Sequence, residues 1–119
     1  NILDKDLSVV FFSIVIFAPI FETFIFQFGI IELLKKIGLL NARKNLIIFV
    51  SAFIFGISHA RNSPRFFYLA KIFIMGLFFA YIYWLYSENN KGGFKVVFLV
   101  HAVHNFIMFE FIVILSQRL

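Results

Sequence analysis

The sequence contains no cysteine, only two prolines, and few charged residues, which make up 14% of its 119 positions. Without cysteine the chain has no disulfide bond, no thiolate metal site and no cysteine nucleophile. What it has in abundance is apolar side chains: 62% of the residues are hydrophobic, and 20 residues are Phe. A soluble domain of this length buries only part of its surface, so it could not hide this much apolar area. The composition therefore predicts a protein that lies in a membrane.

Apolar runs long enough to enter a bilayer alternate with short polar segments. These runs lie at about 9–34, 46–60, 66–86 and 94–116. The second run is short for a span, but the pattern as a whole predicts an all-α fold, a polytopic membrane helix bundle of about four transmembrane helices. Residues 1–119 would form a single domain. Because the chain begins with Asn1 rather than Met, we expect it to be a fragment of a longer membrane protein.

The positive charges are spread along the chain. The net charge is +5, and the Lys and Arg residues lie between the apolar runs rather than in a continuous stripe. That distribution is typical of contacts with lipid headgroups and of membrane topology signals. A nucleic-acid interface would need a basic surface interleaved with aromatic side chains, and no such motif is present. We therefore expect membrane lipid as a partner and no nucleic acid.

The first apolar run carries a carboxylate near its middle, Glu22. A charge at that depth costs about 2.5–3.5 kcal/mol on insertion scales, and such a residue normally faces the bundle interior and has a partner. Glu22 is the candidate general base; the alternative is a protonated Glu that only packs between helices. Pro19 predicts a kink nearby. At the end of the run, the i,i+4 spacing of Glu32 and Lys36 predicts an ion pair.

Candidate partners for Glu22 lie on two other apolar runs. His59 ends the second run, four residues after Phe55. His101 and Asn105 are four residues apart, so they share one face of the last helix. Imidazole and carboxamide groups both donate hydrogen bonds without a net charge, which suits them to stabilising an oxyanion in a dry site. The plainer alternatives are an interfacial histidine in the second run and a pair that only bridges helices in the last.

Together these residues resemble the motifs of the CPBP intramembrane proteases, also called the ABI or CAAX-processing family. The resemblance covers nearly the whole chain and depends on three ordered motifs on three separate runs. They are Ala18-Pro19 followed by Glu22, Phe55 to His59, and His101 to Asn105. Each motif alone is weakly specific, and the ordered set is more so.

The resemblance implies an intramembrane endopeptidase that hydrolyses a peptide bond in or near the membrane. Glu22 and His59 would activate the water, and His101 with Asn105 would stabilise the tetrahedral oxyanion. The substrate would be a peptide or protein, either prenylated or resembling a bacteriocin. The resemblance also implies a multi-pass protein of a prokaryotic plasma membrane.

Two positions depart from the family's first motif. The family has a second Glu and, four residues later, an Arg, where this chain has Thr23 and Gln27. A hydrogen bond between these two side chains could replace an ion pair between the family residues, because positions i and i+4 face one another along a helix. The departure leaves a second interpretation open: a catalytically degenerate membrane protein of the same fold that acts in bacteriocin immunity or partner binding.

The sequence leaves open whether the candidate site binds a metal. Glu22, His59 and His101 offer one oxygen and two nitrogen ligands, a set suited to a divalent metal such as zinc with an open position. The family is often described as metalloproteases. The sequence has no HExxH helix, however, so local spacing does not itself support zinc. A metal-free Glu/His mechanism uses the same residues.

Overall fold

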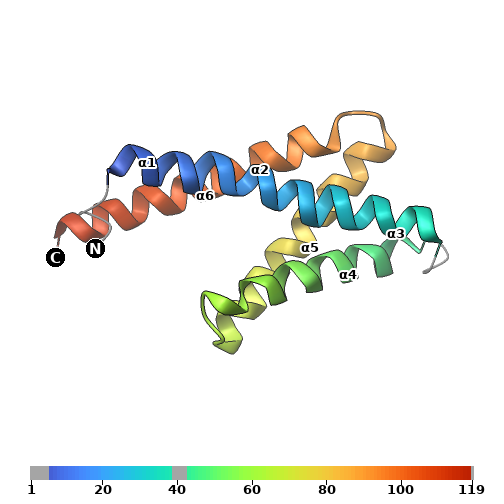
Figure 1. The fold of residues 1–119 in the computed structure, drawn as a ribbon, viewed down its shortest axis with the longest axis horizontal. Coiled ribbons are helices and arrows are strands. Elements are labelled where there is room, and N and C mark those ends of the chain that lie inside the picture. Colours follow the sequence, from blue (N-terminus) through green and yellow to red (C-terminus); the bar gives the residue numbers. More distant parts are fainter. Residues whose placement is uncertain (1–5, 39–42, 119) are drawn as a thin grey trace.

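The computed structural model describes residues 6–38 and 43–118, and nearly all of them are helical (Figure 1). A long first helix runs from Leu7 to Ile37. It is followed by α4 (Lys44–Ser58), α5 (Phe66–Glu88) and α6 (Gly93–Arg118). The described residues contain no strand. The prediction of an all-α fold is therefore confirmed.

The helices form two antiparallel pairs that cross one another. The first helix and α6 run in opposite directions, and α4 turns back into α5 below them in Figure 1. The most extensive packing joins α4 to α5, and α5 also packs on α6. The molecule is elongated, with principal dimensions of 52 × 31 × 16 Å.

In the part of the chain that the structure describes, three helices are long and apolar enough to cross a membrane. They are Leu7–Ile37, Phe66–Glu88 and Gly93–Ser116. The second predicted run forms α4, which has 15 residues. At 1.5 Å per residue α4 is roughly 22 Å long, which is less than the ~30 Å hydrocarbon core. The protein is thus an integral membrane helix bundle with three full-length helices and one shorter helix.

The first helix is irregular on both sides of Pro19. Its segments are α1 (Leu7–Phe11), η2 (Phe12–Phe17), α2 (Ala18–Glu22), η3 (Thr23–Ile30) and α3 (Ile31–Ile37), of which η2 and η3 are π-helical. Proline has no N–H to donate, and its ring disturbs the turn before it. The turn before Pro19 accordingly belongs to the π-helical segment η2, and π-helical turns occur frequently at functional sites. The kink at Pro19 stays a prediction.

The ends of the first helix follow from local chemistry. Asp6 caps the N-terminus, because its carboxylate accepts a hydrogen bond from the main-chain N–H of Ser8 at 2.9 Å. Gly38 ends the helix in the left-handed conformation, with φ of 59°. Glycine adopts this conformation without the steric penalty of a Cβ atom.

The core lies where α3, α4, α5 and the start of α6 meet. Its buried apolar residues are Ile31, Ile47, Ile48, Phe55, Phe79, Ala80, Tyr83 and Val97. Gly76 of α5 allows close approach here, since a Cβ atom at this position would lie 3.1 Å from Ala52 Cα and 2.9 Å from Phe55 Cδ1. In lipid, such close packing is one of the main forces that hold helices together.

A cluster of polar and aromatic groups joins α3 to the end of α5. Lys35 Nζ lies 3.3 Å from Glu32 and 3.5 Å from Glu88, and 4.3 Å above the ring of Trp84. The Tyr83 hydroxyl also donates to Glu32, at 2.9 Å. Lys35 rather than the predicted Lys36 pairs with Glu32, because the i+3 position turns towards α5 and gains these further partners there.

Candidate active site

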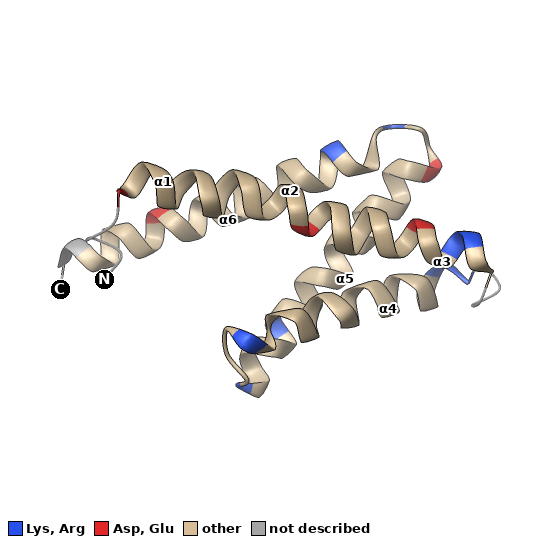
Figure 2. Ribbon diagram, in the orientation of Figure 1, with Lys and Arg blue, Asp and Glu red and all other residues tan. Residues whose placement is uncertain are grey.

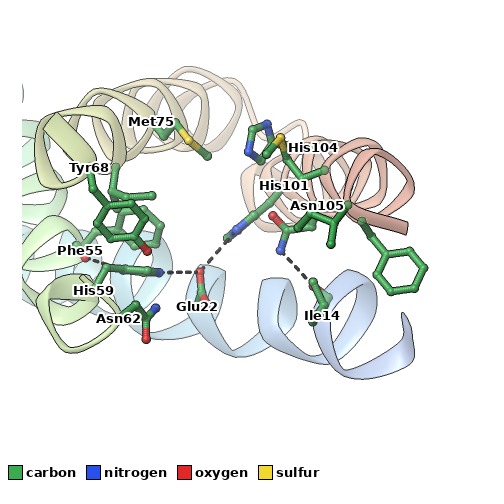
Figure 3. Close-up of a pocket in the computed structure, with 14 residues that line it drawn as sticks. Ile14, Glu22, Phe55, His59, Asn62, Tyr68, Met75, His101, His104 and Asn105 are labelled. Carbon is green, nitrogen blue, oxygen red and sulfur yellow. Dashed lines mark hydrogen bonds and ion pairs between the residues drawn. The ribbon is translucent and has the colours of Figure 1, made fainter. Parts of the chain in front are cut away.

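Glu22 lies between two histidines that come from different helices (Figure 3). It is the last residue of α2, and its Oε2 atom is 3.4 Å from His101 Nε2 in α6 and 3.7 Å from His59 Nε2 at the end of α4. Both separations exceed a direct N–H···O hydrogen bond of about 2.7–3.2 Å. The structure therefore brings together three residues that are separated by up to 79 positions in the sequence.

The orientation of His59 is set by the turn that ends α4. Its Nδ1 atom lies 2.8 Å from the main-chain oxygen of Phe55 and 3.1 Å from Ser58 Oγ. Donation to the Phe55 carbonyl assigns the proton of a neutral ring to Nδ1 and leaves the Nε2 lone pair facing Glu22. The spacing from Phe55 to His59 thus has a physical reason: a carbonyl at position i is within reach of the ring at i+4.

His101 is buried against aromatic rings. It stacks on Phe79, with ring centroids 4.5 Å apart, and meets the edge of Phe55 at 6.2 Å. Its Nδ1 atom has no hydrogen-bond partner among the described residues, whereas its Nε2 atom faces Glu22. The aromatic contacts hold the ring in place and direct a single nitrogen towards the carboxylate.

Asn105 connects α6 to the first helix. Its Nδ2 atom donates a hydrogen bond of 2.9 Å to the main-chain oxygen of Ile14 in η2. One N–H group of Asn105 therefore bridges α6 and the first helix, which was the alternative role predicted for this residue. A carboxamide has two such groups and an acceptor oxygen, and Asn105 also lines the cavity beside Glu22.

The site opens into a cavity of about 300 Å³. Its walls are formed by Ile14, Glu22, Phe55, His59, Asn62, Tyr68, Ile72, Met75, His101, His104, Asn105, Met108, Phe109 and Ile112. All four predicted site residues are among them. No motif in the sequence predicted the contribution of α5, which comes from Tyr68, Ile72 and Met75. Their i, i+4, i+7 spacing predicts a shared helix face, but it does not say what that face meets.

A comparison with protein families gives a match over most of the chain. The model of type II CAAX prenyl endopeptidase Rce1-like proteins matches residues 4–107. The chain belongs to this Rce1-like family. The match includes Glu22, His59, His101 and Asn105, and it confirms the resemblance inferred from their motifs. Searches of curated proteins and of solved structures found no match.

In this Rce1-like chain, Thr23 and Gln27 lie next to the site but not in it. Both side chains are completely buried, and neither lines the cavity. The predicted hydrogen bond between them is not formed: Thr23 Oγ1 and both polar atoms of the Gln27 amide have no partner among the described residues. Both residues belong to η3, whose π-helical backbone bonds run from i to i+5, so α-helical i,i+4 geometry does not apply to them.

The residues around Glu22 do not converge as a metal site. Within residues 6–38 and 43–118, no three His, Asp or Glu side chains are placed to hold one ion. Glu22, His59 and His101 instead offer a carboxylate with an imidazole on either side, an arrangement suited to proton transfer.

Proposed function

We propose that this Rce1-like protein is an intramembrane endopeptidase that hydrolyses a peptide bond in or near the membrane with water activated by Glu22 and His59. The observation that carries the proposal is the position of one carboxylate oxygen, 3.4 and 3.7 Å from two imidazole nitrogens at the wall of a cavity. Desolvated acid and imidazole groups in one cavity are the groups that general acid–base catalysis needs.

The hydrogen-bond inventory supports the activation step. With its Nδ1–H donated to Phe55, a neutral His59 presents a lone pair to Glu22, and an ionised Glu22 presents another. Two acceptors 3.7 Å apart cannot bond to each other, but a water molecule beside both can donate one O–H to each. Glu22 takes one proton from this water as the oxygen attacks the substrate carbonyl carbon.

We assign the later steps of the reaction to the remaining groups. As the new C–O bond forms, the carbonyl oxygen becomes an oxyanion, and we assign its stabilisation to His101 Nε2–H and to the second N–H of Asn105. The hydrogen bond from Asn105 to Ile14 holds the carboxamide in orientation. When the C–N bond breaks, Glu22 returns its proton to the leaving amine. Fixed donors in a dry site stabilise such charge without reorganisation.

The substrate that we propose is a membrane-associated peptide or protein. The family description names prenyl endopeptidases, so a prenylated polypeptide is the first candidate, and a bacteriocin-like peptide is the second. We propose that the protein lies in a prokaryotic plasma membrane.

Cleavage assays on site variants test the mechanism. The protein in lipid nanodiscs is given a prenylated peptide, and the cleavage rate is compared for wild type, Glu22→Gln, His59→Ala and the control Glu110→Gln. Loss of a general base typically lowers the rate about 10²–10⁴-fold, so the first two variants should lose cleavage. Glu110 is exposed on α6 and does not line the cavity, so its variant should retain the rate. Unchanged cleavage by Glu22→Gln would refute the mechanism.

A second function is favoured by one observation. The buried polar atoms of Thr23 and Gln27 have no partner in the described chain, and these residues replace an ionic pair in the family motif. A catalytically degenerate protein could use the same fold for bacteriocin immunity or partner binding. Complementation of a deletion strain with Glu22→Gln separates the two functions: binding survives this change, whereas hydrolysis does not.

A further inference from the structure

A second hollow lies on the α4–α5 pair, outside the catalytic cavity. It has a volume of about 410 Å³, and it is lined by Phe49, Phe53, Gly56, Ile57, Phe66, Leu69, Ala70 and Phe73. The lining is entirely apolar side chains and glycine. None of these residues contributes to the wall around Glu22. We call this hollow the α4–α5 groove.

The two hollows share α5 as a wall. Tyr68, Ile72 and Met75 face the catalytic cavity, whereas Leu69 and Phe73 face the groove. The groove therefore lies on the outer side of α5, where lipid surrounds a helix bundle. An apolar hollow on that side is suited to a hydrocarbon chain and not to a polar ligand.

One end of the groove carries uncompensated positive charge. Arg61 ends the turn after α4, and Arg65 immediately precedes Phe66, whose ring lines the groove. Both arginines are exposed, and neither forms an ion pair within the described ranges. The entire stretch from residue 44 to residue 87 contains no Asp or Glu. Figure 2 shows positively charged residues at this turn and on the adjoining part of α5, and no acidic residue beside them.

We infer that the α4–α5 groove binds one anionic phospholipid, with an acyl chain in the groove and the phosphate group at Arg61 and Arg65. Apolar lining selects the chain, and the unpaired guanidinium groups select the charge of the headgroup. Arginine suits this role because its planar group binds phosphate oxygens in a bidentate manner. Basic residues beside apolar membrane surfaces recognise anionic lipids in this way. The inference does not depend on the proposed peptidase activity.

Native mass spectrometry of the detergent-solubilised full chain tests the site. The protein is titrated with phosphatidylglycerol and, separately, with phosphatidylcholine that has the same acyl chains. We expect one phosphatidylglycerol to bind more tightly than any phosphatidylcholine. The double variant Arg61→Gln, Arg65→Gln should weaken phosphatidylglycerol binding roughly 30-fold, the effect expected for two cations near a lipid phosphate.

Matched variants distinguish lipid binding in the α4–α5 groove from non-specific binding of anionic lipid elsewhere on the protein. Lys91→Gln with Lys95→Gln removes two positive charges from the α5–α6 turn and the start of α6, and should leave binding unchanged. Ala70→Phe fills the groove and should weaken binding, whereas Leu99→Phe on an exposed face of α6 should not. Thermal unfolding of each variant in detergent shows whether the fold is retained. Equal binding of both lipids, or equal losses from the arginine and lysine variants, would overturn the inference.

Discussion

At the scale of single residues, Thr23 and Gln27 are the most unusual feature of the chain. Each has an exposed fraction of 0%, and together they bury three polar atoms without a hydrogen-bond partner among the described residues. A buried polar group in this condition costs about 1–3 kcal/mol. Ser51, also completely buried, differs because its hydroxyl donates to the main-chain oxygen of Phe26 at 2.8 Å.

This contrast predicts opposite effects of similar substitutions. Thr23→Val and Gln27→Leu remove unpartnered polar atoms and should each stabilise the protein by about 1 kcal/mol. Ser51→Ala removes a formed hydrogen bond and should destabilise it by about the same amount. Thermal or denaturant unfolding in detergent micelles gives the comparison. Destabilisation by both Thr23→Val and Gln27→Leu would mean that these polar atoms make favourable polar contacts inside the helix bundle.

At the scale of elements, the close contact of α4 with α5 positions His59, the histidine that we propose to be catalytic. Phe55 lies at the centre of this contact: its carbonyl orients His59, its ring meets His101, and its side chain lies next to the bare Cα of Gly76. A residue that separates the two helices should therefore disturb the site as well as the fold.

Glycine-to-alanine changes at two positions test this coupling. At Gly76 a Cβ atom would come within 3.1 Å of the Ala52 backbone, which cannot easily move, whereas at Gly56 the nearest atom is Phe73 Cβ at 3.4 Å. Gly76→Ala should destabilise the protein by about 1–3 kcal/mol, as overpacking does, and reduce cleavage. Gly56→Ala should be close to neutral in both unfolding and cleavage assays. If Gly76→Ala and Gly56→Ala changed stability and cleavage equally, the close approach of α4 to α5 at Gly76 would not be what positions His59.

At the scale of the whole molecule, the crossing of two helix pairs creates the site. Residue counts along straight, parallel helices would place His59 and His101 at depths roughly 9 Å apart. In the fold both lie within 3.7 Å of the same carboxylate oxygen. In Figure 1, α4 begins beside α3 and runs back at an angle to the first helix instead of parallel to it. The side chains of His59 and Glu22 point towards one another from these two helices (Figure 3).

Cross-linking tests this arrangement. Because the sequence contains no cysteine, only the introduced cysteines can react. The rings of Phe11 in the first helix and Phe109 in α6 have centroids 5.5 Å apart. Phe11→Cys combined with Phe109→Cys should therefore link rapidly with a short bismaleimide in membranes. Phe11→Cys with Phe67→Cys, at the start of α5, is the control and should not link. Efficient linking of the control pair alone would contradict the antiparallel packing of the first helix on α6.

The sequence by itself determined the membrane class, the helical fold and the identity of the four candidate residues. Hydropathy and side-chain spacing are local properties, so the depth of Glu22 in an apolar run and the shared face of His101 and Asn105 are readable from the chain alone. Their family motifs are equally local, and the match to the Rce1-like family agrees with them.

Only the tertiary structure decided which groups meet. The distances from Glu22 to the two histidines, the bond from Asn105 to Ile14, and the place of Tyr68 in the cavity wall all depend on how the helices cross. The sequence also did not predict the π-helical segment that contains Thr23 and Gln27, because their i,i+4 spacing is the same in an α-helix and in a π-helix. The physical reason is that contacts between helices depend on crossing angles and close packing, which no single apolar run encodes.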